Sequence, residues 1–150
     1  MMKPLEDFFS SEIRYLFTDI DGTLTTKDKI SANTYQSLWS LHEAGTKVIL
    51  VTGRPAGWCE LLARQWPVHG VIGENGAFYF RHFENEMKRH FFASQEDRAK
   101  FSLKLKQIEK EVLKKVPKAK VASDQFSRLF DLAIDFAEDV NPPLSKAEIT

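Results

Sequence analysis

The 150-residue chain lacks the features that mark secreted, membrane-spanning and strongly charged proteins. It has one cysteine, Cys59, which cannot form a disulfide within the chain and is expected to be a small buried side chain. The formal net charge is zero, so no overall field favours nucleic acid or a membrane as a partner. No apolar run is long enough to span a bilayer, and the early acids of the N-terminal segment do not fit a secretory signal. We therefore expect a cytoplasmic protein.

The composition provides enough apolar material for a globular core. Apolar residues make up 43% of the chain and include twelve phenylalanines, and the length suits one domain. The four histidines do not have the spacing of metal ligands. Residues 98–120 contain nine Lys or Arg against two acids, without a recognised nucleic-acid-binding motif. We interpret these lysines as the solvated side of an amphipathic helix.

The most informative stretch runs from Tyr15 to Thr23, where an apolar run ends in Asp19 and Asp21. The run predicts a buried strand over roughly residues 13–18, and ligands of open α/β sheets gather at the carboxyl ends of such strands. Because side chains alternate along an extended chain, both carboxylates can face the same way. Two adjacent carboxylates repel unless a proton or a cation separates them, and Mg²⁺ prefers oxygen ligands of this kind. The alternative interpretation is an Asp-Gly turn whose acids only increase solubility. Such a turn requires neither a second Asp two residues earlier nor the Thr that follows.

A second strand, predicted over residues 47–51, ends in Thr52-Gly53-Arg54-Pro55. Gly53 lets the backbone approach an anion, and Pro55 suits the first turn of a helix, whose N-terminus favours negative charge. Taken alone, this pattern is typical of a plain strand-to-helix turn. Its position about thirty residues after the first carboxylates indicates a phosphate-binding loop.

The remaining pattern alternates helices and strands, which predicts a parallel, doubly wound α/β sheet. The expected elements are a connector over 27–30, a helix over 31–44 capped by Ser31, a helix over 55–66, a third strand over 70–73, a turn at Glu74–Ala77 and then a hairpin. Ser94 begins a helix of about twenty residues, and two strands follow over 119–122 and 129–136. A last helix starts at Ser145.

The segment Asp19-Ile-Asp-Gly-Thr-Leu-Thr resembles the first motif of the haloacid dehalogenase-like (HAD) superfamily, and Thr52 resembles its second. The resemblance implies a Rossmann-like core in which Asp19 is the nucleophile and Asp21 the general acid/base. It implies Mg²⁺ as cofactor, with Asp19 and Asp21 as metal ligands. The residues that would bind phosphate or substrate are Gly22, Thr52, Gly53, Arg54 and Asn75.

The order of elements also resembles the HAD phosphatases with a type IIB cap, an α/β unit inserted after the third core strand. We expect a core over residues 1–80, and a hairpin with a partial cap, incomplete at the C-terminus, over 81–150. The third motif, a lysine, and the fourth, an acidic GD element, have no convincing match. The nearest residues are weak candidates: Lys118, Lys120, Asp135, Glu138 and Asp139.

The resemblance implies a Mg²⁺-dependent phosphohydrolase that acts on small phosphate monoesters, sugar phosphates above all, through an aspartyl-phosphate. A phosphosugar mutase of the same superfamily is the enzymatic alternative. The other alternative is a truncated, non-catalytic domain that binds phosphate or a partner. Since open strand edges and exposed apolar faces promote association, self-association is also expected.

Overall fold

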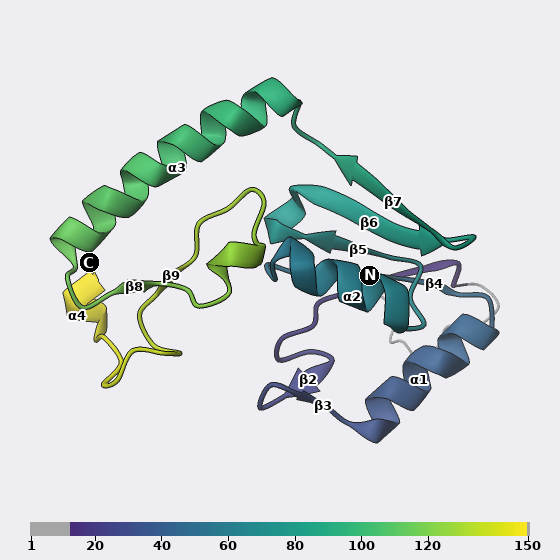
Figure 1. Cartoon of the computed structure of the whole chain (residues 1–150). Helices are drawn as coiled ribbons and strands as arrows, with labels where there is room; N and C mark the ends of the chain where they lie inside the picture. The colour runs from purple at the N-terminus through teal and green to yellow at the C-terminus, as the bar shows by residue number, and fades with distance from the viewer. Residues whose placement is uncertain (1–12, 150) are drawn as a thin grey trace, which may run out of the picture. The chain divides into compact units, whose positions relative to one another are not determined.

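The computed structural model describes residues 13–149 of the chain (Figure 1). Its contacts group these residues into two compact units. The first unit contains the described residues up to Arg54 together with Trp58–Phe91. The second contains Pro55–Gly57 and the described residues from Phe92 onward. Within the described part, no helix combines the length and the apolar content that a membrane span requires.

The first unit is built on a five-stranded sheet in which an antiparallel hairpin extends a parallel core. The strand order is β1-β4-β5-β6-β7, with β1 (Tyr15–Thr18), β4 (Lys47–Val51), β5 (Gly70–Gly73), β6 (Phe78–Phe83) and β7 (Glu86–Phe91). The parallel strands β1, β4 and β5 confirm the predicted α/β class with a Rossmann-like core. β6 pairs antiparallel with β5 because the three-residue turn η3 (Glu74–Gly76) is too short for a parallel crossover.

The hairpin expected after the third strand is therefore present, as β6 and β7. Residues 81–91 pair within this sheet, whereas the sequence interpretation grouped them with the cap. The division of the chain into a catalytic core and a cap stays a prediction.

Two helices connect the parallel strands: α1 (Ala32–Glu43) and α2 (Ala56–Gln65). The Ser31 side chain accepts a hydrogen bond from the Thr34 amide, which confirms Ser31 as the N-cap of α1. Gly45, with φ of +82°, lies just past the helix end, where a left-handed residue ends the helix. Both helix boundaries agree with the sequence prediction to within a residue or two.

The core of the first unit lies on one face of the sheet. Five strand residues on this face are almost fully buried: Val48, Leu50, Val71, Phe78 and Phe80. Cys59 of α2 is fully buried, as predicted, and its sulfur would lie 2.6 Å from a Cβ placed on Gly73. Helix α2 therefore packs closely on β5, at the strand end that precedes the turn η3.

A second, two-stranded sheet follows the first strand: β2 (Thr25–Thr26) and β3 (Lys29–Ile30). The sequence analysis expected only a connector here. Lys27 and Asp28 both have positive φ, as a two-residue hairpin turn requires. The prediction failed because strands of two residues have no measurable periodicity and the turn lacks Asn-Gly.

The second unit contains the long helix α3 (Gln95–Lys115), capped by Ser94 as predicted. The two expected strands are present but shorter, as β8 (Lys120–Val121) and β9 (Ile134–Asp135). The short helix α4 (Lys146–Ile149) begins at the predicted place. A small core is formed by Ala119, Val140 and Leu144, against which Leu113, Val116 and Ile134 pack. No residue of α3 itself is fully buried: Phe101 and Ile108 of its apolar stripe are exposed, and Leu105, Val112 and Val116 are half-buried.

Candidate active site

The first candidate loop follows β1 and contains Asp19 and Asp21, both of which are exposed. Ile20 between them is only 6% exposed, so it turns toward the interior as the alternation predicted. Its carbonyl accepts hydrogen bonds from the amides of Thr23, Leu24 and Thr25 at 3.2, 2.9 and 3.0 Å. The loop is thus wound around one backbone carbonyl, which leaves both carboxylates open to solvent.

Thr25 holds this loop in place, a role that the sequence analysis did not assign. The Thr25 hydroxyl donates to the Ile20 carbonyl at 3.1 Å and accepts from the Gly22 amide at 3.3 Å. The residue is only 9% exposed, so its bond to the Ile20 carbonyl is buried and the bond from the Gly22 amide is partly buried. Gly22 has φ of +75°, a left-handed conformation that glycine adopts without strain.

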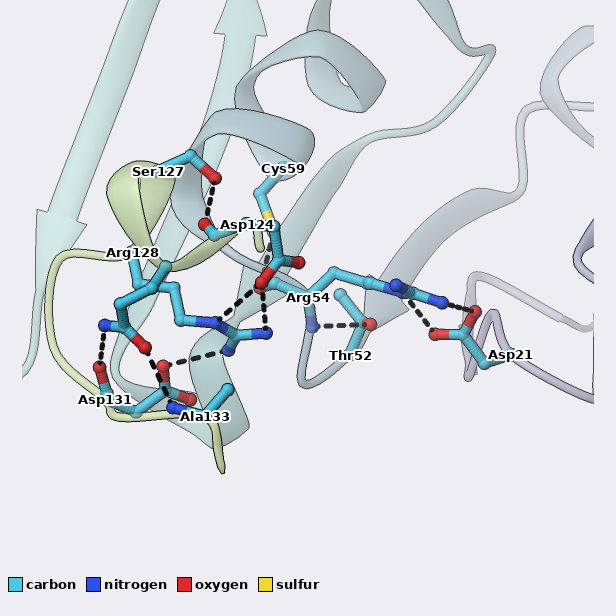
Figure 2. Close-up of polar contacts among 10 residues, drawn as sticks. Asp21, Thr52, Arg54, Cys59, Asp124, Ser127, Arg128, Asp131 and Ala133 are labelled. Carbon is cyan, nitrogen blue, oxygen red and sulfur yellow. Dashed lines mark hydrogen bonds and ion pairs between the residues drawn. The ribbon is translucent and has the colours of Figure 1, made fainter. Parts of the chain in front are cut away.

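The second candidate loop follows β4 and begins with Thr52, which is 4% exposed. The Thr52 hydroxyl oxygen accepts a hydrogen bond from the Arg54 amide at 3.0 Å (Figure 2). Since Thr18 of β1 lies opposite Leu50 of β4 in a parallel pair, the loops after these strands leave the same edge of the sheet. Ligands of open α/β sheets bind at this edge.

Arg54 connects the two loops directly. Its Nε donates to Oδ2 of Asp21 at 3.0 Å, and its Nη2 donates to Oδ1 at 2.8 Å, as Figure 2 shows. The guanidinium also lies 4.6 Å from the Trp58 ring centroid. Because the Asp21 side chain is 42% exposed, this ion pair adds little to folding stability. Its main consequence is positional: it fixes a cation beside the Asp21 carboxylate.

The third candidate loop is the turn η3, which lies against the second. The Asn75 amide donates to the Thr52 carbonyl at 3.3 Å, and the Glu74 amide donates to the Arg54 carbonyl at 3.2 Å. A Cβ on Gly53 would lie 3.1 Å from Oδ1 of Asn75, so the absence of a side chain there permits this approach. The structure therefore brings Asn75 to Thr52 and Gly53.

The backbone of η3 is unusual in a way that the sequence did not indicate. Glu74, Asn75 and Gly76 have consecutive φ values of +44°, +57° and +98°. Asn and Gly adopt this region readily, but Glu does not, and Glu74 is also only 3% exposed. Backbone strain of this kind is concentrated at functional sites.

The donor atoms of the first loop suit Mg²⁺. Asp19 and Asp21 supply hard oxygen ligands, and Mg²⁺ is often held by one or two carboxylates together with substrate phosphate. Within residues 13–149 no group of three or more His, Cys, Asp or Glu side chains could hold a metal ion. The Asp21 carboxylate of the candidate pair contacts Arg54 in this structure.

The weaker acidic candidates have local roles in the second unit. Oδ1 of Asp135 accepts from the amides of Ala137 and Glu138, both at 2.8 Å, and Oδ2 accepts from the amide of Asp139 at 2.7 Å. These backbone donors, Ala137 and Asp139 above all, lower the pKa of Asp135. Its carboxylate orders a turn, which explains this acidic cluster without a metal.

The weak lysine candidates also have local partners. Lys118 donates to Oε1 of Glu148 at 2.8 Å, and this contact, with the hydrogen bonds from Ser145, lowers the pKa of Glu148 to about 2. Lys120 lies in β8 opposite Asp135. Neither arrangement indicates a role in phosphate chemistry.

The second unit also contains an ion cluster that the sequence analysis missed (Figure 2). Arg128, with a side chain only 9% exposed, contacts Asp131 at 2.9 Å and Asp124 at 3.4 Å. The Gln125 amide donates to the Asp131 carbonyl, and its oxygen accepts from the Ala133 amide. These contacts explain why the loop after β8 is ordered with little strand structure.

A profile of the haloacid dehalogenase-like hydrolase family matches residues 16–116, and the chain belongs to this family. Among solved structures, the chain is similar to a Thermoplasma acidophilum protein, with 26% identity over 82% of this chain and a TM-score of 0.62. It shares its fold with a HAD-superfamily phosphatase of Bacteroides thetaiotaomicron, with 20% identity over 98% of this chain and a TM-score of 0.52. A HAD subclass IIB sugar phosphatase matches 63% of this chain and 37% of its own, at 28% identity and a TM-score of 0.44.

The chain spans about half the length of the first two of these structures, 51% and 53% respectively. No curated protein sequence matches it significantly. The HAD resemblance drawn from the two motifs is thus confirmed at the level of the family. The roles of individual site residues stay predictions.

The role of Thr25 leads to a stability prediction. We expect Thr25→Val, which keeps the shape of the side chain, to destabilise the first unit by about 1–3 kcal/mol because it leaves the Ile20 carbonyl and Gly22 amide short of a partner. The exposed neighbour Thr26 provides the matched control, and Thr26→Val should change stability by less than about 0.5 kcal/mol. Urea unfolding followed by tryptophan fluorescence measures both. Equal effects of the two substitutions would contradict the role of Thr25.

Proposed function

We propose that the three loops form the phosphate-handling part of a Mg²⁺-dependent phosphohydrolase that acts on small phosphate monoesters. The observation that best supports this proposal is the exposed pair of Asp19 and Asp21 beside Thr52 and Arg54, at the carboxyl ends of parallel strands. A carboxylate nucleophile, a hydroxyl and a guanidinium are groups that can carry out and stabilise phosphoryl transfer.

In this proposal Asp19 attacks the phosphorus atom. A new bond forms between a carboxylate oxygen of Asp19 and phosphorus, the bond from phosphorus to the ester oxygen breaks, and the leaving alcohol takes a proton from Asp21. Water then attacks the phosphorus of the aspartyl-phosphate, with Asp21 as base, which releases inorganic phosphate and restores Asp19. The Asp19 side chain and the Asp21 carbonyl would hold Mg²⁺, which when bound would supply positive charge opposite the transferring phosphoryl group.

The contact between Arg54 and Asp21 gives this sequence of steps a physical constraint. Arg54 donates hydrogen bonds to both carboxylate oxygens of Asp21, so the ion pair occupies the side chain that would exchange a proton with the leaving alcohol. A bound phosphoryl group offers Arg54 a second anion. Movement of Arg54 to that group would free the Asp21 oxygens, so that Asp21 could approach the leaving alcohol.

The finer parts of the proposal come from the family. Sugar phosphates as substrates, a type IIB cap and a cytoplasmic location agree with the family membership and with the sequence. Asn75, which lies against Gly53, would contact the substrate from the third loop.

Hydrolysis of p-nitrophenyl phosphate by the purified chain, with and without Mg²⁺, tests the proposal. We expect Mg²⁺-dependent turnover that Arg54→Met reduces strongly. Binding of phosphate without turnover would instead support the non-catalytic phosphate-binding domain. Transfer of phosphate between positions of one sugar phosphate, without net hydrolysis, would support the mutase.

A further inference from the structure

A pocket of about 280 Å³ lies in the first unit, away from the three candidate loops. Its chemistry-bearing residues come from four parts of the unit: His42 in the last turn of α1, Lys47 at the start of β4, His69 just before β5, and Arg81 and His82 in β6. The candidate active site is at the carboxyl end of β4, and this pocket is at its amino end. An extended strand rises about 3.3 Å per residue, so the two sites are roughly 15 Å apart along the sheet.

The pocket is lined by basic groups without acidic ones. No Asp or Glu is among its lining residues. Within residues 13–149, neither Lys47 nor Arg81 takes part in an ion pair. The two cations are held by aromatic side chains instead: Lys47 donates to the Tyr15 hydroxyl at 3.4 Å, and the Arg81 guanidinium lies 4.3 Å from the Phe83 ring centroid. Their charges are therefore not neutralised within the described structure.

His69 responds to this environment. Burial lowers the pKa of His69, and the nearby charges of Arg81 and Lys47 lower it further. Lys47 and Arg81 thus supply fixed positive charge to the pocket, and the His69 ring supplies further hydrogen-bonding nitrogens. An anion placed here would offset the repulsion among these groups.

We propose that this pocket is an anion site that binds a small oxyanion of the phosphate or sulfate class, separate from the candidate active site. Lys47 and Arg81 donate charge-assisted hydrogen bonds to the oxyanion, and the imidazoles of His42, His69 and His82 complete its surroundings. The volume is slightly below the roughly 300 Å³ of the smallest pockets that hold drug-sized ligands, which suits a tetrahedral ion or a small phosphate ester. Nothing in the proposed hydrolysis uses this site.

The proposal can be tested by NMR of the full chain with inorganic phosphate and, separately, sulfate as probes. The imidazole resonances of His42, His69 and His82 should shift together and saturate. Lys47→Met and Arg81→Met should each weaken this saturation by about tenfold or more, since each removes one charge-assisted contact. Both side chains are at least partly exposed, so the variants should fold, and the dispersion of the amide spectrum checks this.

Two control variants separate the outcomes. Lys29→Met removes an equal charge from an exposed position outside the pocket and should leave the histidine shifts unchanged. Asp19→Asn alters the candidate active site and should also leave them unchanged, so that failure of the proposed hydrolysis does not affect this test.

If the histidines fail to respond, or respond equally in the Lys47, Arg81 and Lys29 variants, the anion site is refuted. Shifts confined to residues 19–25 and 52–54 would refute it as well.

Discussion

Asp19→Asn is expected to abolish phosphoryl transfer while the fold stays intact. The amide is nearly isosteric with the carboxylate but is not a nucleophile, and the exposed Asp19 side chain makes no hydrogen bond among the described residues. Loss of a covalent nucleophile typically lowers turnover by about 10⁴-fold or more. Hydrolysis of p-nitrophenyl phosphate measures this loss.

Direct detection of the intermediate makes the test of Asp19 sharper. After incubation with acetyl phosphate and Mg²⁺, borohydride reduction and peptide mass spectrometry should locate the modified residue at Asp19 and nowhere else. The matched control is Asp28→Asn, the same chemical change at an exposed turn of the same unit, which should keep full labelling and turnover. Labelling of another carboxylate, or retained turnover in well-folded Asp19→Asn, would remove Asp19 from the nucleophilic role.

Much of the fold of the first unit follows from local sequence. Strands β4 and β5 were predicted to the residue, because short apolar runs bounded by Gly, Thr and Pro are local patterns. Ser31 and Ser94 were identified as N-caps because capping depends on residues three positions apart. The left-handed Gly45 after α1 belongs to the same class of local features.

The parts that sequence could not predict depend on contacts between distant residues or on backbone strain. Arg54 and Asp21 are 33 positions apart, and their pairing arises only once β1 and β4 lie side by side. The positive φ of Glu74 contradicts its residue preference and is imposed by the turn between antiparallel strands.

Phe78→Ala is expected to have the largest effect on stability. Phe78 is 0% exposed, stacks on Phe80 with ring centroids 4.1 Å apart, and fills the space above Gly73. Truncation of a buried phenylalanine removes apolar contacts and leaves a cavity, which costs about 3–5 kcal/mol. Phe83→Ala makes the same deletion in the same strand, but Phe83 is 41% exposed, so its cost should be smaller by about 2 kcal/mol or more.

Urea unfolding monitored by tryptophan fluorescence measures this difference, because Trp39, Trp58 and Trp66 all belong to the first unit. Similar midpoints for the two variants would show that the face carrying Phe78 is not the core of this unit.

The loss of the Phe78 ring also has a consequence for the candidate active site. Phe78 pairs with Gly73 directly beside η3, so a cavity there should loosen the turn that places Asn75 against Gly53. In urea-free buffer, amide exchange at Asn75 should therefore accelerate in Phe78→Ala and stay unchanged in Phe83→Ala, since only the buried ring supports that end of the sheet.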